Sequence, residues 1–97
     1  MTTNDAKERL GRLFWDDLQI KHGKGDPELV AELNEITAEL QSLDAQSTSI
    51  LMLRYRSRLP FKDIAKAIHY SVAQTRRLHD AAVEKYRKAQ ERKPENV

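Results

Sequence analysis

The sequence predicts an all-α fold of about five helices. Apolar residues recur at steps of three and four through most of the chain, which is the period of an amphipathic helix. Apart from Gly11, which lies inside the first stretch, proline and glycine stand outside these periodic stretches, where they end one helix or begin the next. No stretch alternates apolar and polar residues as a half-buried strand does. The expected helices span about residues 5–22, 27–42, 45–58, 61–68 and 72–92.

The first two helices are expected to form an N-terminal helical hairpin. Asp26 can cap the second helix, and Pro27 suits its first turn. Trp15 lies beside the apolar stripe of the first helix; we expect it to pack on the hairpin, with an exposed anchor for a partner as the alternative. The apolar residues of the second helix alternate at four- and three-residue steps, as in a coiled-coil seam. At this length a core-facing stripe is the commoner outcome. The alternative is a dimer or partner surface that joins Trp15 to Leu29, Leu33, Ile36 and Leu40.

The stretch from Pro60 to residue 82 has the anatomy of a helix-turn-helix. A short helix opened by Pro60, a three-residue turn and a longer helix follow one another there. Ala65 is small enough to let the two helix backbones approach. Ser71 can cap the longer helix by accepting a hydrogen bond from a free amide two or three residues further along the chain. Asp44 can cap the helix expected at 45–58 in the same way.

The last helix divides into an inward and an outward face at 100° per residue. The inward stripe, expected to pack on the rest of the domain, consists of Thr75, Leu78, Ala82 and Tyr86. On the outward face, DNA base contacts are expected from Ala73, Gln74 and Arg77. Phosphate contacts are expected from Ser71, Arg76, Lys62, Arg58 and Arg56. The alternative for each basic residue taken singly is an ordinary solvated surface.

The chain also divides by charge. Residues 1–48 carry five basic and ten acidic side chains, whereas the remainder carries twelve basic and five acidic ones. A basic module attracts DNA phosphates by releasing counterions, and an acidic one is freer for protein contacts. We therefore expect an acidic N-terminal helical arm at 1–43 for dimerisation or partner contact. A helix-turn-helix DNA-binding domain should follow at 44–92, with a frayed tail at 93–97.

Composition excludes several classes of function. The chain has no cysteine, so neither a disulfide framework nor a thiolate metal site is available, and a reducing compartment, the cytoplasm, is expected. No two of His22, His69 and His79 fall on adjacent turns of one helix, so no metal is expected. No apolar run approaches the roughly 20 residues of a membrane span. No catalytic triad order or nucleophile elbow is present. We expect no cofactor, no membrane partner and no enzymatic activity.

Several of these residues carry a resemblance to a known family. The segments Leu53–Tyr55 and Leu59–Ala65, with Ser71 and the Arg76–Arg77 pair, resemble region 4 of the sigma-70 family, the module that reads the −35 promoter element. The stretch from 69 to 79 is closer still to phage late-transcription regulators of the RinA and ArpU kind. The likeness covers about residues 43–86. Two departures are His69, where sigma-type turns usually place a left-handed glycine, and Thr75, where valine is usual. Nothing in the chain resembles sigma region 2.

The resemblance implies a sequence-specific, double-stranded DNA-binding transcription regulator of phage or mobile-element origin, acting in the cytoplasm of a bacterial host. RNA polymerase is an implied further partner. Because a single helix-turn-helix makes few base contacts, we expect a homodimer on two half-sites. The alternative is a region-4-like protein-interaction module that binds RNA polymerase or another regulator with little DNA contact. An exposed apolar patch on the N-terminal helices would favour that alternative.

Overall fold

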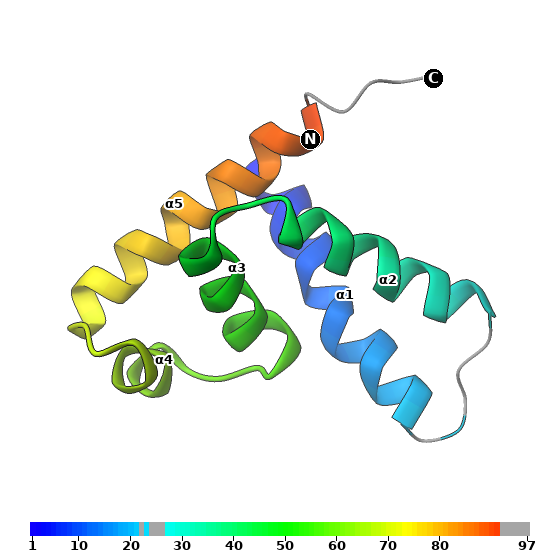
Figure 1. Ribbon diagram of the computed structural model, residues 1–97, viewed down its shortest axis with the longest axis horizontal. Coiled ribbons are helices and arrows are strands. Elements are labelled where there is room, and N and C mark those ends of the chain that lie inside the picture. Colours follow the sequence, from blue (N-terminus) through cyan, green and yellow to red (C-terminus); the bar gives the residue numbers. More distant parts are fainter. Residues whose placement is uncertain (22, 24–26, 92–97) are drawn as a thin grey trace.

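Helices make up most of the computed structural model, which describes residues 1–21, 23 and 27–91 (Figure 1). The predicted all-α class is confirmed, since the described residues contain five α-helices and no strand. The elements are α1 (Thr3–Lys21), α2 (Pro27–Gln41), α3 (Ala45–Leu51), the π-helical turn η1 (Met52–Arg56), α4 (Phe61–Ile68) and α5 (Val72–Glu91). The predicted cap at Asp26 and the predicted frayed tail at 93–97 lie outside the described residues.

The ends of the short central helices follow from their capping residues. The Asp44 carboxylate accepts a hydrogen bond from the Ser47 amide at 3.1 Å, which confirms it as the N-cap of α3. Hydrogen bonds from Ser47 hold the pKa of this carboxyl well below its usual range, and Lys85 of α5 adds an ion pair at 3.0 Å. The third helix was expected to run unbroken to residue 58. It widens instead into η1, and Arg58 in a left-handed conformation (φ 55°) closes it.

A hydrophobic core joins the described N-terminal and C-terminal parts of the chain. Its buried side chains come from α1, α2, α3 and α5, namely Ala6, Leu10, Leu13, Ile36, Leu40, Leu51, Ala82, Val83 and Tyr86. In Figure 1, α1 and α2 lie side by side as the predicted hairpin, and the start of α1 lies beside the end of α5. The described part of the segment 1–43 is therefore packed into the same body as 44–91, and its separate role in partner contact stays a prediction.

Burial decides between the two expectations for the apolar stripe of α2. Ile36 and Leu40 are completely buried, and Leu33 packs against the core. The expected core-facing stripe is therefore confirmed for these three residues. The alternative of a dimer seam through them is wrong for this fold, because their side chains already fill the protein's own interior. Leu29 is half-buried and is not free of partners. The expectation that Trp15 packs on the hairpin is also wrong, because its side chain is 55 % exposed.

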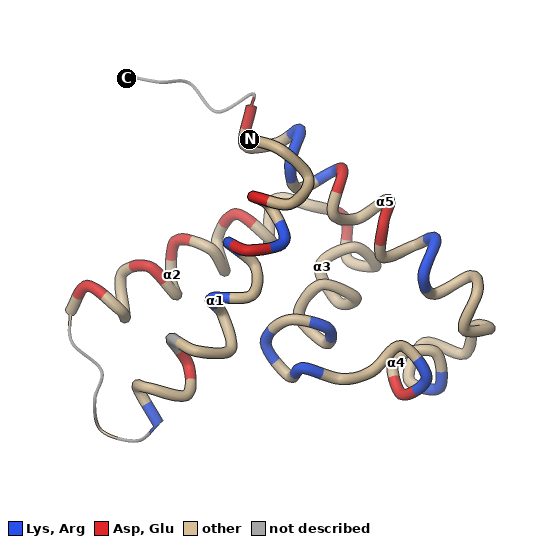
Figure 2. The backbone as a smooth tube through the Cα atoms, turned by 180° about the vertical axis from the view of Figure 1, so that it is seen from behind, with Lys and Arg blue, Asp and Glu red and all other residues tan. Residues whose placement is uncertain are grey.

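The two charge types are unevenly distributed along the backbone (Figure 2). Acidic residues recur along α2, and basic residues lie in and just after η1, whereas α1, α4 and α5 carry both signs. The charge division read from the sequence is thus also a spatial one.

Candidate nucleic-acid interface

The chain from α4 to α5 forms a helix-turn-helix whose turn is fixed by backbone geometry. His69 adopts the left-handed conformation that its position requires, with φ 63° and ψ 39°, and the Tyr70 amide donates to the carbonyl of Ala65 at 3.1 Å. This bond satisfies a carbonyl at the end of α4 that would otherwise be unpaired. Histidine is a non-glycine residue that tolerates this conformation, so the turn forms without glycine.

The first turn of α5 is held by a reciprocal cap. The Gln74 amide donates to the Ser71 hydroxyl at 3.1 Å, which confirms the predicted capping role of Ser71. In return, the Ser71 amide donates to the Gln74 side-chain carbonyl at 3.3 Å. This is a capping box, and the serine-x-x-glutamine spacing in the sequence could have revealed it. A bidentate contact between Gln74 and adenine needs that same carbonyl oxygen, so it requires this side of the cap to open.

The two faces of α5 are disposed as expected. Thr75, Ala82 and Tyr86 are buried, and Leu78 is half-buried. Ala65 of α4 is also buried, as expected for a residue where two helices cross. The residues on the opposite face at the start of α5 are exposed, namely Ala73, Gln74, Arg76 and Arg77. The start of α5 therefore presents a polar, basic surface while its other side anchors the helix to the core.

The expected phosphate-binding residues fall into two groups. Ser71, Lys62 and Arg76 are exposed on the helix-turn-helix itself, with the Arg76 guanidinium 5.6 Å from the centre of the Phe61 ring. Arg56 and Arg58 instead contact α1. The Arg56 guanidinium lies 3.3 Å from an Asp17 carboxylate oxygen, and that of Arg58 lies 4.9 Å from the centre of the Phe14 ring. A phosphate contact by Arg56 or Arg58 would therefore have to replace these contacts within the protein or form beside them.

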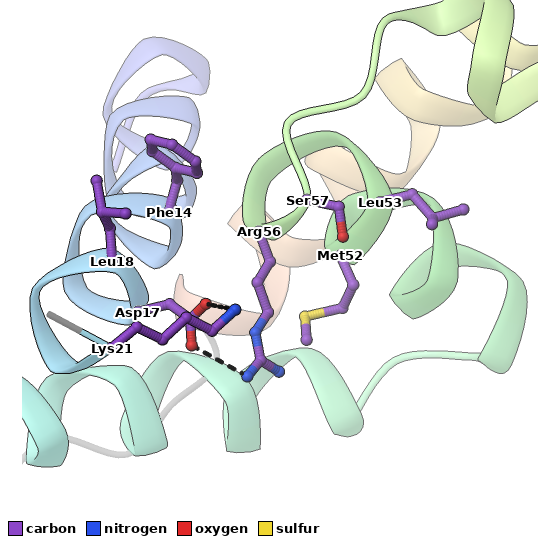
Figure 3. A pocket seen from close by; sticks show the side chains of 8 residues that line it. All are labelled: Phe14, Asp17, Leu18, Lys21, Met52, Leu53, Arg56 and Ser57. Carbon is purple, nitrogen blue, oxygen red and sulfur yellow. Dashed lines mark hydrogen bonds and ion pairs between the residues drawn. The ribbon is translucent and has the colours of Figure 1, made fainter.

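Asp17 and Arg56 both line a groove of about 510 Å³ between α1 and η1. Figure 3 shows the Asp17 carboxylate between Lys21 and Arg56, with Phe14, Leu18 and Met52 among the lining side chains. Burial acts to raise the pKa of Asp17, but the hydrogen bonds from Lys21 and Arg56 outweigh it and hold that pKa below its usual range. The groove thus combines apolar side chains with the Asp17 carboxylate, which pairs with both Lys21 and Arg56.

His79 packs on the buried side of the helix-turn-helix, a role that the sequence did not lead us to expect. The ring is buried, with one nitrogen 2.9 Å from the Tyr55 hydroxyl and the other 3.0 Å from the Asp80 carboxylate. The Phe61 ring of α4 meets it edge-on, at 5.0 Å between centroids. Its position four residues after Thr75 on the inward stripe was the available signal. Burial lowers the pKa of His79, and the bond to Asp80 only partly opposes this.

This lowered pKa predicts a loss of stability on acidification. The unfolded chain takes up a proton on this histidine near pH 6.5, whereas the folded chain does so only at lower pH. His79 thus contributes stability above pH 6.5 that is lost as the pH falls toward its folded pKa. Urea unfolding at pH 7, 6 and 5 is expected to give a steeper fall in the free energy of unfolding for the wild type than for His79→Gln, by up to about 1.4 kcal/mol per pH unit. Parallel pH profiles would contradict this role.

Two further types of site are absent from the described residues. No three histidine, cysteine, aspartate or glutamate side chains gather there as a metal-binding group. None of the described helices combines the length and the apolar character that crossing a bilayer requires. Comparison of the chain with protein-family models, with curated proteins and with solved structures finds no match.

Proposed function

We propose that this protein binds double-stranded DNA through α4, the turn and the start of α5, and that it acts as a sequence-specific transcription regulator. The observation that carries the proposal is the exposed outer face of α5. Arg76 and Arg77 project there beside Ala73, and neither arginine forms an ion pair with a described carboxylate. Because the opposite face of α5 is buried in the core, the two guanidinium groups stand on a rigid support.

The roles of individual residues follow from their chemistry. Arginine can donate two hydrogen bonds to the major-groove edge of guanine, and a small methyl side chain can contact thymine, which suits Arg77 and Ala73 to base contacts. Arg76, beside the Phe61 ring, and Lys62 on α4 suit the phosphate backbone. Two copies bound to adjacent half-sites would double these few contacts. The resemblance to phage late-transcription regulators supports the same function.

One observation favours a second candidate, a protein-interaction module that contacts RNA polymerase or another regulator. Trp15 is 55 % exposed on α1, and its one ring contact with a described aromatic residue is edge-on to Phe14 at 5.9 Å. Phe14 also lines the groove shown in Figure 3. An exposed tryptophan beside an apolar groove is typical of surfaces that anchor a protein partner.

The proposed DNA contact is tested by Arg76→Ala and a matched control. Arg76→Ala is expected to weaken binding to all duplex sequences alike and to reduce the slope of log affinity against log salt by about one, because one phosphate contact is lost. Fluorescence anisotropy with a labelled duplex at several salt concentrations measures both effects. Lys88→Ala removes the same charge from the exposed end of α5 and is expected to leave the slope unchanged. Equal behaviour of the two variants, or no duplex binding by the wild type, would overturn the proposal.

A further inference from the structure

A second cavity, lined by residues different from those of the groove in Figure 3, lies between α1, η1 and the segment that joins η1 to α4. It has a volume of about 400 Å³, and its lining residues are Gly11, Arg54, Tyr55, Arg58 and Pro60. This volume is within the range of about 300–1,000 Å³ that is usual for small-ligand sites. The Tyr55 hydroxyl is already bonded to His79, so the two arginines supply the donors of the cavity.

Gly11 is a residue that the fold itself does not require. It lies inside α1, where glycine destabilises a helix relative to alanine. A Cβ atom at this position would meet nothing within 4 Å, and the backbone is not in a left-handed conformation. Neither packing nor geometry within the chain accounts for the missing side chain. Its effect is to leave the α1 backbone open to whatever enters the cavity.

Arg58 is a second lining residue whose type does not suit its backbone conformation. Its backbone is left-handed, with φ 55°, a conformation in which an arginine is strained and glycine is not. The strained position nevertheless carries a long cationic side chain, whose guanidinium lies over the Phe14 ring. Two residues that each weaken the local structure therefore line the same cavity. Such departures from local preference are expected where a residue serves function and not stability.

The charge of the cavity is uncompensated. Arg54 is held by the Phe61 ring, at 4.3 Å from its centre, and by one hydrogen bond to the Leu59 carbonyl. Neither Arg54 nor Arg58 forms an ion pair with a carboxylate among the described residues, whereas the intervening Arg56 is paired with Asp17. The aromatic contacts fix the two guanidinium groups without neutralising them. The cavity is thus arranged to receive an anion.

We propose that Arg54 and Arg58 bind a phosphate group in this cavity, with Gly11 providing the space against α1. Guanidinium groups present paired donors that match the oxygens of phosphate, and this chemistry favours phosphate over a simple halide. The group has two possible sources, a free phosphorylated small molecule or the backbone of bound duplex DNA. Only the second source rests on the proposed function.

Two variants test the site without the risk of unfolding the protein. Gly11→Leu fills the open space with a better helix former, and Arg58→Gly removes the cation while relieving the left-handed strain. Both are expected to keep or raise the melting temperature in circular dichroism. Arg58→Gly is expected to weaken phosphate binding about tenfold, the usual effect of losing one charged hydrogen bond. Gly11→Leu is expected to weaken phosphate binding because its side chain occupies the space of the ligand. Lys88→Ala is the control for the loss of one positive charge.

The measurement is calorimetric titration of the full chain in two arms, first with inorganic phosphate and then with duplex DNA. Phosphate binding that both variants weaken supports the site with a free ligand as its source, even if no duplex binds and the proposed function fails. Weakening in the duplex arm alone supports the site with the DNA backbone as its source. If both variants bind like the wild type, the inference is overturned, while duplex binding sensitive to Arg76→Ala would leave the proposed function standing. A wild type that binds neither probe overturns both.

Discussion

Replacing Glu39 with alanine is expected to lower the free energy of unfolding by about 1–3 kcal/mol, because the buried Tyr86 hydroxyl loses its acceptor and Arg9 loses its buried partner. The Glu39 side chain is only 4 % exposed and accepts two hydrogen bonds from Arg9 of α1, at 3.1 and 3.0 Å. It also accepts a bond from the Tyr86 hydroxyl of α5 at 2.7 Å. Burial and the bond to Glu39 raise the pKa of Tyr86, which keeps that hydroxyl a donor. This cluster ties α1, α2 and α5 together.

Glu35→Ala is the matched control for this prediction. Glu35 lies one turn earlier on α2 and also contacts Arg9, at 3.3 Å, but its side chain is 59 % exposed. Water screens such a pair, so its removal is expected to cost about 0–1 kcal/mol. Urea unfolding followed by circular dichroism measures both variants. Similar small losses for the two glutamates would mean that the buried cluster does not hold the hairpin to α5.

Replacing Arg77 with alanine is expected to remove about 1–3 kcal/mol of discrimination at one base pair of the target site, because a bidentate contact with a base edge is lost. The residue is exposed near the start of α5, on the face opposite the buried Thr75 stripe, so truncation should leave the fold intact. The prediction differs in kind from that for Arg76, whose loss should weaken every sequence equally.

The measurement for Arg77 is the affinity of the wild type and the variant for a set of duplexes that each carry one changed base pair. We expect the variant to become indifferent to one position and to keep the others. A uniform loss across all duplexes would assign Arg77 to the phosphate backbone and would leave the base contacts to other residues of α5.

Local signals predicted the elements of the helix-turn-helix closely. Pro60 and the apolar spacing of the following residues gave the bounds of α4, which runs from Phe61 to Ile68 as expected. The resemblance to sigma region 4 implied a left-handed backbone at His69, and the residue adopts it. Each of these features depends on residues a few positions apart, where the chemistry of caps and turns dominates.

Features that depend on distant residues could not be predicted in this way. The apolar stripe of α2 has the same spacing whether it faces a second copy or the protein's own core, so sequence left both open and burial of Ile36 and Leu40 decided it. The Arg56 contact with Asp17 joins residues 39 positions apart, and no periodic pattern encodes such a pair. The same holds for the Arg9–Glu39–Tyr86 cluster.

The central claim, sequence-specific DNA binding by α5, is tested most directly by selection of duplexes from random genomic fragments at two salt concentrations. Sequencing of the retained DNA is expected to give one enriched motif that survives the higher salt, because base contacts are less sensitive to salt than phosphate contacts. A symmetric motif would indicate that two copies bind together. Retention without enrichment, or binding that disappears at modest salt, would contradict the claim and would favour a protein partner on the surface around Trp15.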